Sequence, residues 1–389
     1  MEKMNELTGY LRKNGDYGTR NHVLIMPTVS CVNGIVQRII KDVPEASWIT
    51  HAHGCSRGGE RDLQILFRIL SRMILHPNVG GVVLIGLGCE VSNIKNLAPF
   101  IKDAGKPMEI LNVQDDGGSL KTAEKGIAAA RKLLKEIGKE RRVPMPWAKL
   151  MVSMKCGGSD AMSGVTANVA MGAVSDWLVQ KGATVIFGEN TEMIGVDHVL
   201  KRRAKNEQVA ERIGKMIADA EKLTHDVMGA LASLVISPGN MDGGMSTIAE
   251  KSMGCIFKGG TTTINQVVDY GEVPTEKGLI LQDGPGNDGD AMAGLAASGS
   301  QLIFFSTGRG TPVGFPILPV IKVASNTRTF EAMPDDMDIN AGHLLEGESL
   351  NGLRDNMIEY MIRMINGDQT KAEANSMGLF TFMTVYPPF

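Results

Sequence analysis

Apolar runs alternate with amphipathic stretches along the first 140 residues of the chain. Four short runs predict strands, because a strand buried on both faces of a parallel sheet carries apolar side chains on both sides. They span residues 22–29, 46–50, 79–87 and 109–113. Between them, apolar residues recur at helical spacing near residues 32–41, 63–74, 92–104 and 120–139. This alternation predicts a Rossmann-like α/β layer with helices on both faces of a parallel sheet.

A second α/β region follows a stretch with two prolines. Residues 138–147 combine Pro144 and Pro146 with charged residues, a composition typical of a linker. Beyond it we expect a helix capped by Asn206, a further helix at 165–181, and strands at 150–154, 184–187, 278–281, 301–305 and 317–323. Gly-rich turns separate the runs after residue 237. We therefore predict a Rossmann-like domain over residues 1–143 and a C-terminal α/β catalytic domain with Gly-rich loops over residues 144–389.

Charge and composition exclude several classes of protein. The formal net charge is −3, and no like-charge run is long enough to predict a nucleic-acid-binding patch. No window is apolar enough to predict a membrane span, and the polar N-terminus does not resemble a signal peptide. The five cysteines are odd in number and widely spaced, which argues against a disulfide framework. We expect a cytoplasmic protein that acts on a small molecule.

Four polar clusters each follow a predicted strand, at residues 50–55, 86–90, 155–160 and 187–192. Sites in open parallel sheets form outside the carboxyl ends of the strands, so these clusters are placed to converge. In the first two, the candidate metal ligands are His51, Cys55, Cys89 and Glu90, donors of the kind that zinc or ferrous iron prefers. The structural alternative is a hydrogen-bonded histidine, buried thiols and a tight strand-to-helix turn.

The third and fourth clusters combine a thiol, glycines and carboxylates. Cys156 is a further candidate ligand, and Gly157, Gly158 and Ser159 are placed to bind an anion through backbone N–H groups at the start of a helix. Asp160 either caps that helix or moves a proton. In the fourth cluster Glu189 and Glu192 can each ligate a metal or transfer a proton.

Two arginines are candidates for binding the acid group of a substrate. Arg309 stands among glycines after a predicted strand, an arrangement suited to bidentate carboxylate or sulfonate recognition. Arg20 and Asn21 precede a strand, which places them at the opposite edge of the sheet. For these two residues either that segment folds over toward the site, or their role is structural.

Taken in order, these segments resemble the altronate and galactarate dehydratase family over about residues 9–347. The resemblance is carried by residues 16–21 (DYGTRN), 50–55 (THAHGC), 76–90 (HPNVGGVVLIGLGCE), 155–160 (KCGGSD), 237–240 (SPGN), 258–262 (KGGTT), 306–310 (STGRG) and 336–342 (DMDINAG). It implies elimination chemistry on small hydroxy acids, usually with Fe(II). On that basis we expect a metal held by the His51–Cys55 and Cys89–Glu90 loops with Cys156 or Glu189. Asp160 or Glu192 would be the base, and Arg309 would hold the acid.

Two departures from the family pattern refine this expectation. Single-chain members carry a small domain before the segment that begins here at Gly9, which only eight residues precede. The chain is therefore similar to the large subunit of a split enzyme, with a separate small subunit as partner in a hetero-oligomer. Ala161-Met162 also replaces a more usual Gly-Phe pair. We expect (2R)-sulfolactate as substrate, giving pyruvate and sulfite, with dehydration of altronate or a related sugar acid as the alternative.

Overall fold

The first parallel sheet has four strands in the order β4 (Ser47–Trp48), β3 (His22–Pro27), β5 (Val79–Gly86) and β6 (Met108–Asn112). The computed structural model describes residues 6–55, 59–229 and 238–385. Every strand pair in this sheet is parallel. One face packs on α1 (Asn33–Asp42) and α5 (Ser119–Ile137), and the other packs on α2 (Glu60–Leu75) and α3 (Ile94–Ile101). The predicted α/β fold is confirmed.

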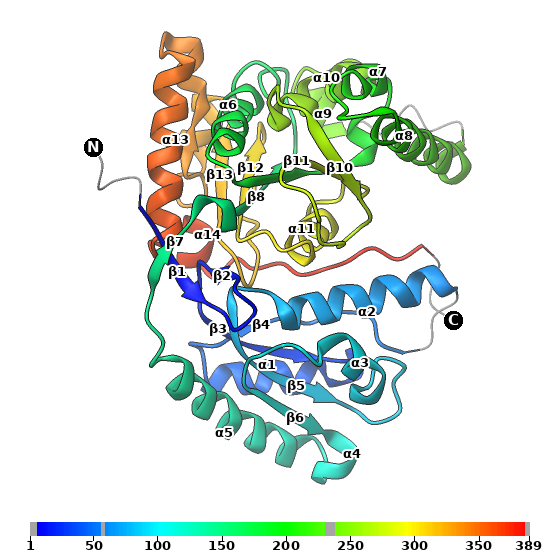
Figure 1. Ribbon diagram of the computed structural model, residues 1–389, viewed down its shortest axis with the longest axis vertical. Helices are drawn as coiled ribbons and strands as arrows, with labels where there is room; N and C mark the ends of the chain where they lie inside the picture. The colour runs from blue at the N-terminus through cyan, green and yellow to red at the C-terminus, as the bar shows by residue number, and fades with distance from the viewer. Residues whose placement is uncertain (1–5, 56–58, 230–237, 386–389) are drawn as a thin grey trace.

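The second sheet has seven parallel strands, shown in the upper half of Figure 1. Their order is β10 (Ile264–Val268), β11 (Gly278–Gln282), β9 (Thr184–Phe187), β8 (Met151–Cys156), β12 (Leu302–Thr307), β13 (Val320–Ala324) and β14 (Ile339–Asn340). On one face lie α6 (Ala167–Gln180) and α13 (Leu350–Ile365). On the other face, α11 (Asp288–Ala297) packs against α2 of the first sheet.

The chain reverses its direction of travel across this sheet at β8. That strand lies between β9, which follows it through α6, and β12, which follows α11. A crevice outside the carboxyl ends of two such strands is the usual ligand site of an open α/β sheet. The fold therefore directs attention to the segments after Cys156, Phe187 and Thr307.

The predicted linker is partly a strand. Within it, β7 (Val143–Met145) pairs antiparallel with β1 (Leu7–Leu11), which also pairs with β2 (Tyr17–Gly18). Pro144 opposes Thr8 in this ribbon, and β7 is its edge strand. A proline is tolerated there because an edge strand has one side without a hydrogen-bonded neighbour. Two prolines signalled a break in the main sheets correctly, but they did not exclude local pairing.

The remaining helices are α4 (Val113–Asp116), α7 (Asp197–Lys201), α8 (Glu207–Met228), α9 (Pro238–Asp242), α10 (Ile248–Ile256), α12 (Thr327–Ala332) and α14 (Lys371–Ala374). Of these, α4 follows β6 in the first half and the others belong to the second half. Asn206 caps α8 through the N–H of Val209, as predicted. The C-terminal segment then crosses between the two sheets, where Phe380 and Phe382 join a core shared by both halves (Figure 1). None of the helices in the described part combines the length and apolar character needed to cross a bilayer.

Candidate active site at the carboxyl ends of β8 and β9

Two thiols and two carboxylates meet outside the carboxyl ends of β8 and β9. Cys156 ends β8, and Glu189 and Glu192 lie in the loop that follows β9. Cys255 lies on α10. This helix packs closely against the turn before α6, since a Cβ on Gly164 would lie only 2.8 Å from the Cα of Gly254. A Cβ on Gly254 would lie 3.1 Å from the Cα of Gly164, so the close contact depends mainly on glycine at position 164.

The donor atoms of Cys156, Cys255 and Glu192 lie within 4.8 Å of one another, and all three side chains are buried. The two sulfur atoms are 3.7 Å apart, and the Ser159 hydroxyl is 3.1 Å from the sulfur of Cys156. Among the described residues, Cys156, Cys255 and Glu192 are the one set of at least three thiol, imidazole or carboxylate side chains whose donor atoms lie close enough to hold a metal ion.

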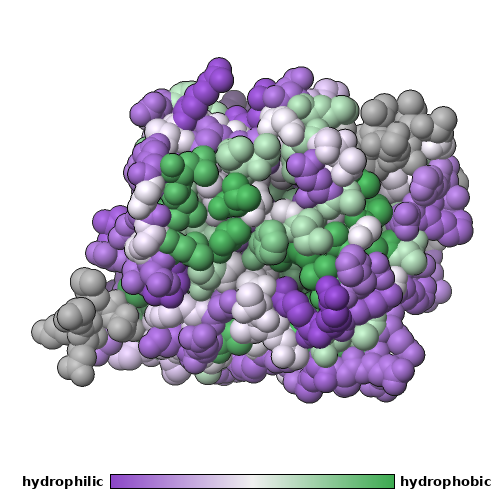
Figure 2. Space-filling model, turned by 90° about the horizontal axis from the view of Figure 1, so that it is seen from above, coloured by the Kyte–Doolittle hydropathy of each residue, from purple (hydrophilic) through white to green (hydrophobic). Residues whose placement is uncertain are grey.

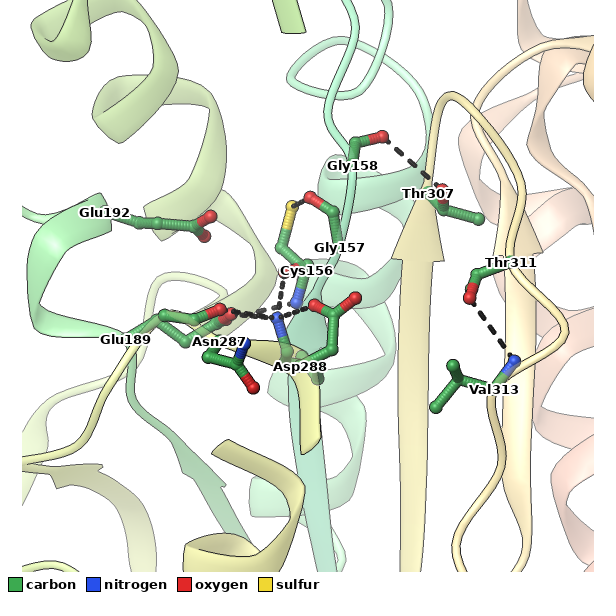
Figure 3. A network of polar contacts seen from close by, with 12 residues as sticks. Cys156, Gly157, Gly158, Glu189, Glu192, Asn287, Asp288, Thr307, Thr311 and Val313 are labelled. Atoms are coloured by element: carbon green, nitrogen blue, oxygen red, sulfur yellow. Dashed lines mark hydrogen bonds and ion pairs between the residues drawn. The ribbon is translucent and has the colours of Figure 1, made fainter. Parts of the chain in front are cut away.

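Three buried lysines surround these acids. Lys155 Nζ donates to Glu189 and lies 2.8 Å from Asp288. Lys258 Nζ lies 2.6 Å from Glu189 and 3.5 Å from Glu192, and Lys251 Nζ lies 3.0 Å from the other oxygen of Glu192. Figure 3 shows the side chains of Glu189 and Glu192 pointing toward Cys156 and Asp288. The lysines and carboxylates thus form a buried network of alternating positive and negative charges at the carboxyl ends of β8 and β9.

This environment moves the protonation equilibria of the acids in opposite directions. Burial raises the pKa of Glu189 to about 7, and the neighbouring Glu192 charge adds to that effect. Burial would also raise the pKa of Glu192, but Lys251 and Lys258 outweigh it and lower that pKa. The hydrogen bond from the Cys255 thiol lowers the pKa of Cys156. Glu189 therefore binds a proton more readily than an ordinary carboxylate, and Glu192 less readily.

Glu189 also has an unusual backbone conformation. Its φ is 80°, in the left-handed region that non-glycine residues rarely adopt. The conformation is held by hydrogen bonds at both ends, since the N–H of Cys156 donates to Glu189 Oε2 and the N–H of Glu192 donates to the carbonyl of Glu189. Strain of this kind is commonly maintained where a side chain must be aimed at a site.

The predicted ligands of the first sheet have other partners. The two ring nitrogens of His51 contact the carbonyl of Pro27 at 3.0 Å and the N–H of His53 at 3.2 Å, and burial lowers its pKa to about 4. The ring of Phe382 packs against the imidazoles of His51 and His53. Glu90 accepts hydrogen bonds from Thr28 and from two backbone N–H groups.

Cys55 and Cys89 are exposed. Over the described residues, the predicted convergence of the His51–Cys55 and Cys89–Glu90 loops with Cys156 is therefore not seen. The reason is that each sheet has its own carboxyl edge, and the C-terminal segment packs against the histidine loop. The thiols and carboxylates that do meet belong to the second sheet.

Asp160 is held at both oxygens. Oδ1 accepts from the N–H and hydroxyl of Ser163 and from the hydroxyl of Ser325, and Oδ2 accepts from the Asn326 amide. These contacts pin the turn after β8 to the loop after β13. They favour a structural role for Asp160 over proton transfer.

The predicted anion-binding turn is smaller than expected. Helix α6 begins only at Ala167, and the N–H of Gly157 donates to the carbonyl of Ser306. The N–H groups of Gly158 and Ser159 have no acceptor within the described residues. Gly157 itself is required because a Cβ there would lie 2.4 Å from the Phe305 ring. Two adjacent N–H groups thus remain available to an anion.

Arg309 lies beside these free N–H groups. Its side-chain stem passes over Gly158, and its exposed guanidinium makes no hydrogen bond or ion pair to any described residue. Arg20 is different, because it pairs with Glu373 at 2.7 Å and donates to the carbonyls of Met364 and Asp368. Asn21 donates to the carbonyl of Ile137. For Arg20 and Asn21 the structure favours the structural alternative.

Sequence reasoning missed Lys155, Lys251, Cys255 and Lys258. A usable signal exists for three of them, since Lys251, Cys255 and Lys258 are spaced four and three residues apart, which places them on one side of α10 and its 3-10 extension η6 (Phe257–Gly259). Lys155 stands out as a charged residue inside a buried strand. Neither signal names the partner across the crevice.

A cavity of about 560 Å³ opens next to the site, between α2 and the carboxyl ends of β10 and β11. Its walls include Arg61, Arg212 and Asp283. The Oδ1 of Asp283 accepts a 2.5 Å hydrogen bond from Asn190, the residue after Glu189. One residue that lines the cavity is therefore hydrogen-bonded to the loop that carries both carboxylates of the site.

Comparison with known proteins covers nearly the whole chain. A family model described as D-galactarate/altronate dehydratase, C-terminal, matches residues 147–387. A second, described as D-galactarate dehydratase/altronate hydrolase, second domain, matches residues 9–138.

Individual relatives agree with these models. Altronate dehydratase of Bacillus subtilis (strain 168) is 38% identical over 385 residues, which cover 94% of this chain and 75% of the relative. Galactarate dehydratase (L-threo-forming) of Escherichia coli (strain K12) is 34% identical over 401 residues, 98% of this chain and 76% of the relative. The (2R)-sulfolactate sulfo-lyase subunit beta of Chromohalobacter salexigens is 32% identical over 381 residues, 97% of each chain.

Proposed function

Because the chain belongs to the D-galactarate/altronate dehydratase family, we propose that it is the large subunit of a lyase that removes the C3 substituent of a small anionic 2-hydroxy acid. The matched relatives are dehydratases and a sulfo-lyase, and elimination is common to both. The observation that carries the proposal is the buried cluster of thiols, carboxylates and lysines at the switch point of the second sheet. Near it lies Arg309, whose guanidinium has no partner among the described residues.

For the substrate we put (2R)-sulfolactate first and altronate second. Sulfolactate is supported by the match over 97% of the relative named as a sulfolactate sulfo-lyase subunit. Altronate is supported by the higher identity, 38%, to an altronate dehydratase. Both substrates are 2-hydroxy acids with a leaving group at C3, so one arrangement of residues serves either.

Different residues of this chain would bind the acid group and accept the C2 proton during the elimination. Arg309, with the N–H groups of Gly158 and Ser159, would bind the acid group at the rim of the crevice. Of the two carboxylates we assign Glu189 as the proton acceptor, because its pKa is raised toward neutrality. The C2 proton passes to that carboxylate as the bond from C3 to sulfur or oxygen breaks. The electron pair leaves with sulfite, or with hydroxide that is protonated to water, and the enol product becomes a 2-keto acid.

The lysines act as fixed charges. Although burial lowers the pKa of Lys155 and Lys258, the facing carboxylates outweigh it and raise both. An ammonium group that stays protonated stabilises negative charge developing on the substrate but is a poor nucleophile. Schiff-base chemistry is therefore not the route we propose.

The family resemblance implies Fe(II). When bound, such an ion acidifies the C2 proton by stabilising the enediolate charge. Among the described residues, Cys156, Cys255 and Glu192 fit it, because soft thiolates with one carboxylate suit ferrous iron and Glu192 keeps a buried oxygen without a hydrogen bond.

We also propose a small subunit as partner in a cytoplasmic hetero-oligomer. The sulfo-lyase relative is named as a subunit, so that protein has more than one chain. Figure 2 looks down on the end of the molecule that carries α6 and α10 and shows apolar side chains gathered over it. Met162, Val165, Met253 and Phe257, in or beside these elements, are between 37% and 59% exposed. Apolar surface of this kind is usually covered by a partner.

The test is a two-substrate assay on the chain reconstituted anaerobically with Fe(II), alone and with its small subunit. We expect sulfite and pyruvate from (2R)-sulfolactate in equal amounts, and a 2-keto-3-deoxy acid from altronate if the alternative holds. Turnover of altronate alone would overturn the sulfolactate assignment. Failure of both substrates, with the small subunit present, would overturn the proposed lyase function for these acids.

A further inference from the structure

We infer that Cys156, Cys255 and Glu192 form a three-ligand metal centre with an open coordination position, selective for thiophilic divalent ions over Mg²⁺ and Ca²⁺. This deepens the proposed function, on which it rests for its role in catalysis. Cys255 belongs to none of the polar clusters that follow the predicted strands. It reaches the site only through the packing of α10 against the turn before α6.

The spacing of the two sulfur atoms is the first argument. Thiolates bound to a tetrahedral ion at about 2.3 Å lie about 3.8 Å from each other. The sulfurs of Cys156 and Cys255 are 3.7 Å apart, so both can bind one ion without moving apart. The same separation is far longer than the roughly 2.05 Å of a disulfide bond. The pair is arranged as two ligands.

The third ligand is available and oriented. Glu192 Oε1 is held by Lys251 at 3.0 Å, whereas Oε2 is buried and has no hydrogen bond among the described residues, although Lys258 Nζ lies 3.5 Å away. A buried carboxylate oxygen normally has a hydrogen-bonded partner. Lys251 and Lys258 thus act as positioning residues, which hold the carboxylate as outer groups hold metal ligands elsewhere.

Charge balance supports a divalent ion. Five acidic side chains, Cys156, Cys255, Glu189, Glu192 and Asp288, face the three lysines Lys155, Lys251 and Lys258. A metal ion binds thiolates and displaces the thiol protons, and with both thiols ionised the acids would exceed the lysines by two negative charges in a buried site. One divalent cation neutralises that excess, and an uncompensated buried charge is costly.

The ligand types decide which ions bind. Thiolates favour Fe(II), Co(II) and Zn(II), whereas Mg²⁺ and Ca²⁺ prefer all-oxygen sites. Three protein ligands leave a fourth tetrahedral position free, as in catalytic rather than structural sites.

The test is metal binding by the full chain, measured apart from activity. Anaerobic protein loaded with Co(II) should hold one equivalent and show the thiolate-to-cobalt absorption of two sulfur ligands, and excess Mg²⁺ should not displace it. Cys156→Ser and Cys255→Ser should each halve the charge-transfer intensity, and Glu192→Gln should weaken Co(II) binding roughly tenfold or more. Cys31→Ser, at an exposed thiol, is the matched control and should change nothing.

Three results of the metal-binding experiment would overturn the inference. They are wild-type protein without thiolate-to-cobalt absorption, cysteine variants with unchanged spectra, and displacement of the ion by Mg²⁺. The wild-type spectrum needs no variant, so the test stands even if a substitution prevents folding. Substrate turnover by metal-free protein would also end the inference while leaving the lyase proposal intact. A bound ion as described, with neither substrate converted, would end the lyase proposal alone.

Discussion

Replacing Lys155 with methionine tests whether the buried charge network holds the second sheet together. Methionine keeps an unbranched side chain, slightly shorter than that of lysine, but removes the ammonium group that contacts Glu189 and Asp288. Both Lys155 and Glu189 are fully buried, so the substitution leaves a carboxylate short of a partner away from water. Breaking a buried pair from one side typically costs about 3–5 kcal/mol. We expect a loss of that size in the free energy of unfolding.

The loss of stability in Lys155→Met should depend on pH. The pKa of Glu189 is raised to about 7, so its protonation contributes stability that is lost as pH rises through that value. Without Lys155 the carboxyl group holds its proton to a still higher pH. The variant should therefore lose less stability relative to wild type at about pH 6 than at about pH 8.

The measurement is urea unfolding followed by circular dichroism at both pH values. Lys155→Met combined with Glu189→Gln should recover part of the loss, because the unpaired charge is then removed as well. Lys215→Met is the control, since Lys215 pairs with Asp219 on the exposed side of α8 and should matter little. A Lys155→Met variant as stable as this control, or a double variant less stable than the single one, would refute the argument.

Three further predictions concern activity. Arg309→Met should raise KM for the substrate about 10- to 100-fold without changing the unfolding curve, because it removes one exposed charge-assisted contact; unchanged KM in steady-state assays would contradict the assignment. Borohydride added with substrate should not inactivate the enzyme, because the buried lysines stay protonated; mass spectrometry showing a reduced adduct on Lys155 or Lys258 would contradict this. The rate should fall as pH drops below about 7, where Glu189 gains a proton, and Glu189→Gln should abolish that limb of the pH profile together with most of kcat.

The elements of the fold were readable from the sequence where one local rule dominated. The run that became β5 is apolar throughout because both of its faces are covered, and Asn206 caps α8 through an interaction within three residues. The linker was misjudged in part because pairing of β7 with β1 joins segments more than 130 residues apart. Prolines report on local backbone freedom and carry no information about such a partner.

The amino-acid pattern predicts two α/β layers and places Cys156, Glu189 and Glu192 after buried strands. Strand pattern and chain order suffice for that, because the carboxyl end of a strand is a local property. Packing between elements brings Cys255 and three lysines to these residues. It also gives His51 and Glu90 other hydrogen-bond partners and pairs Arg20 with Glu373 near the C-terminal helices. The physical reason is that a site is defined by distances between side chains on different elements, and those distances are set by how the helices pack on the sheets.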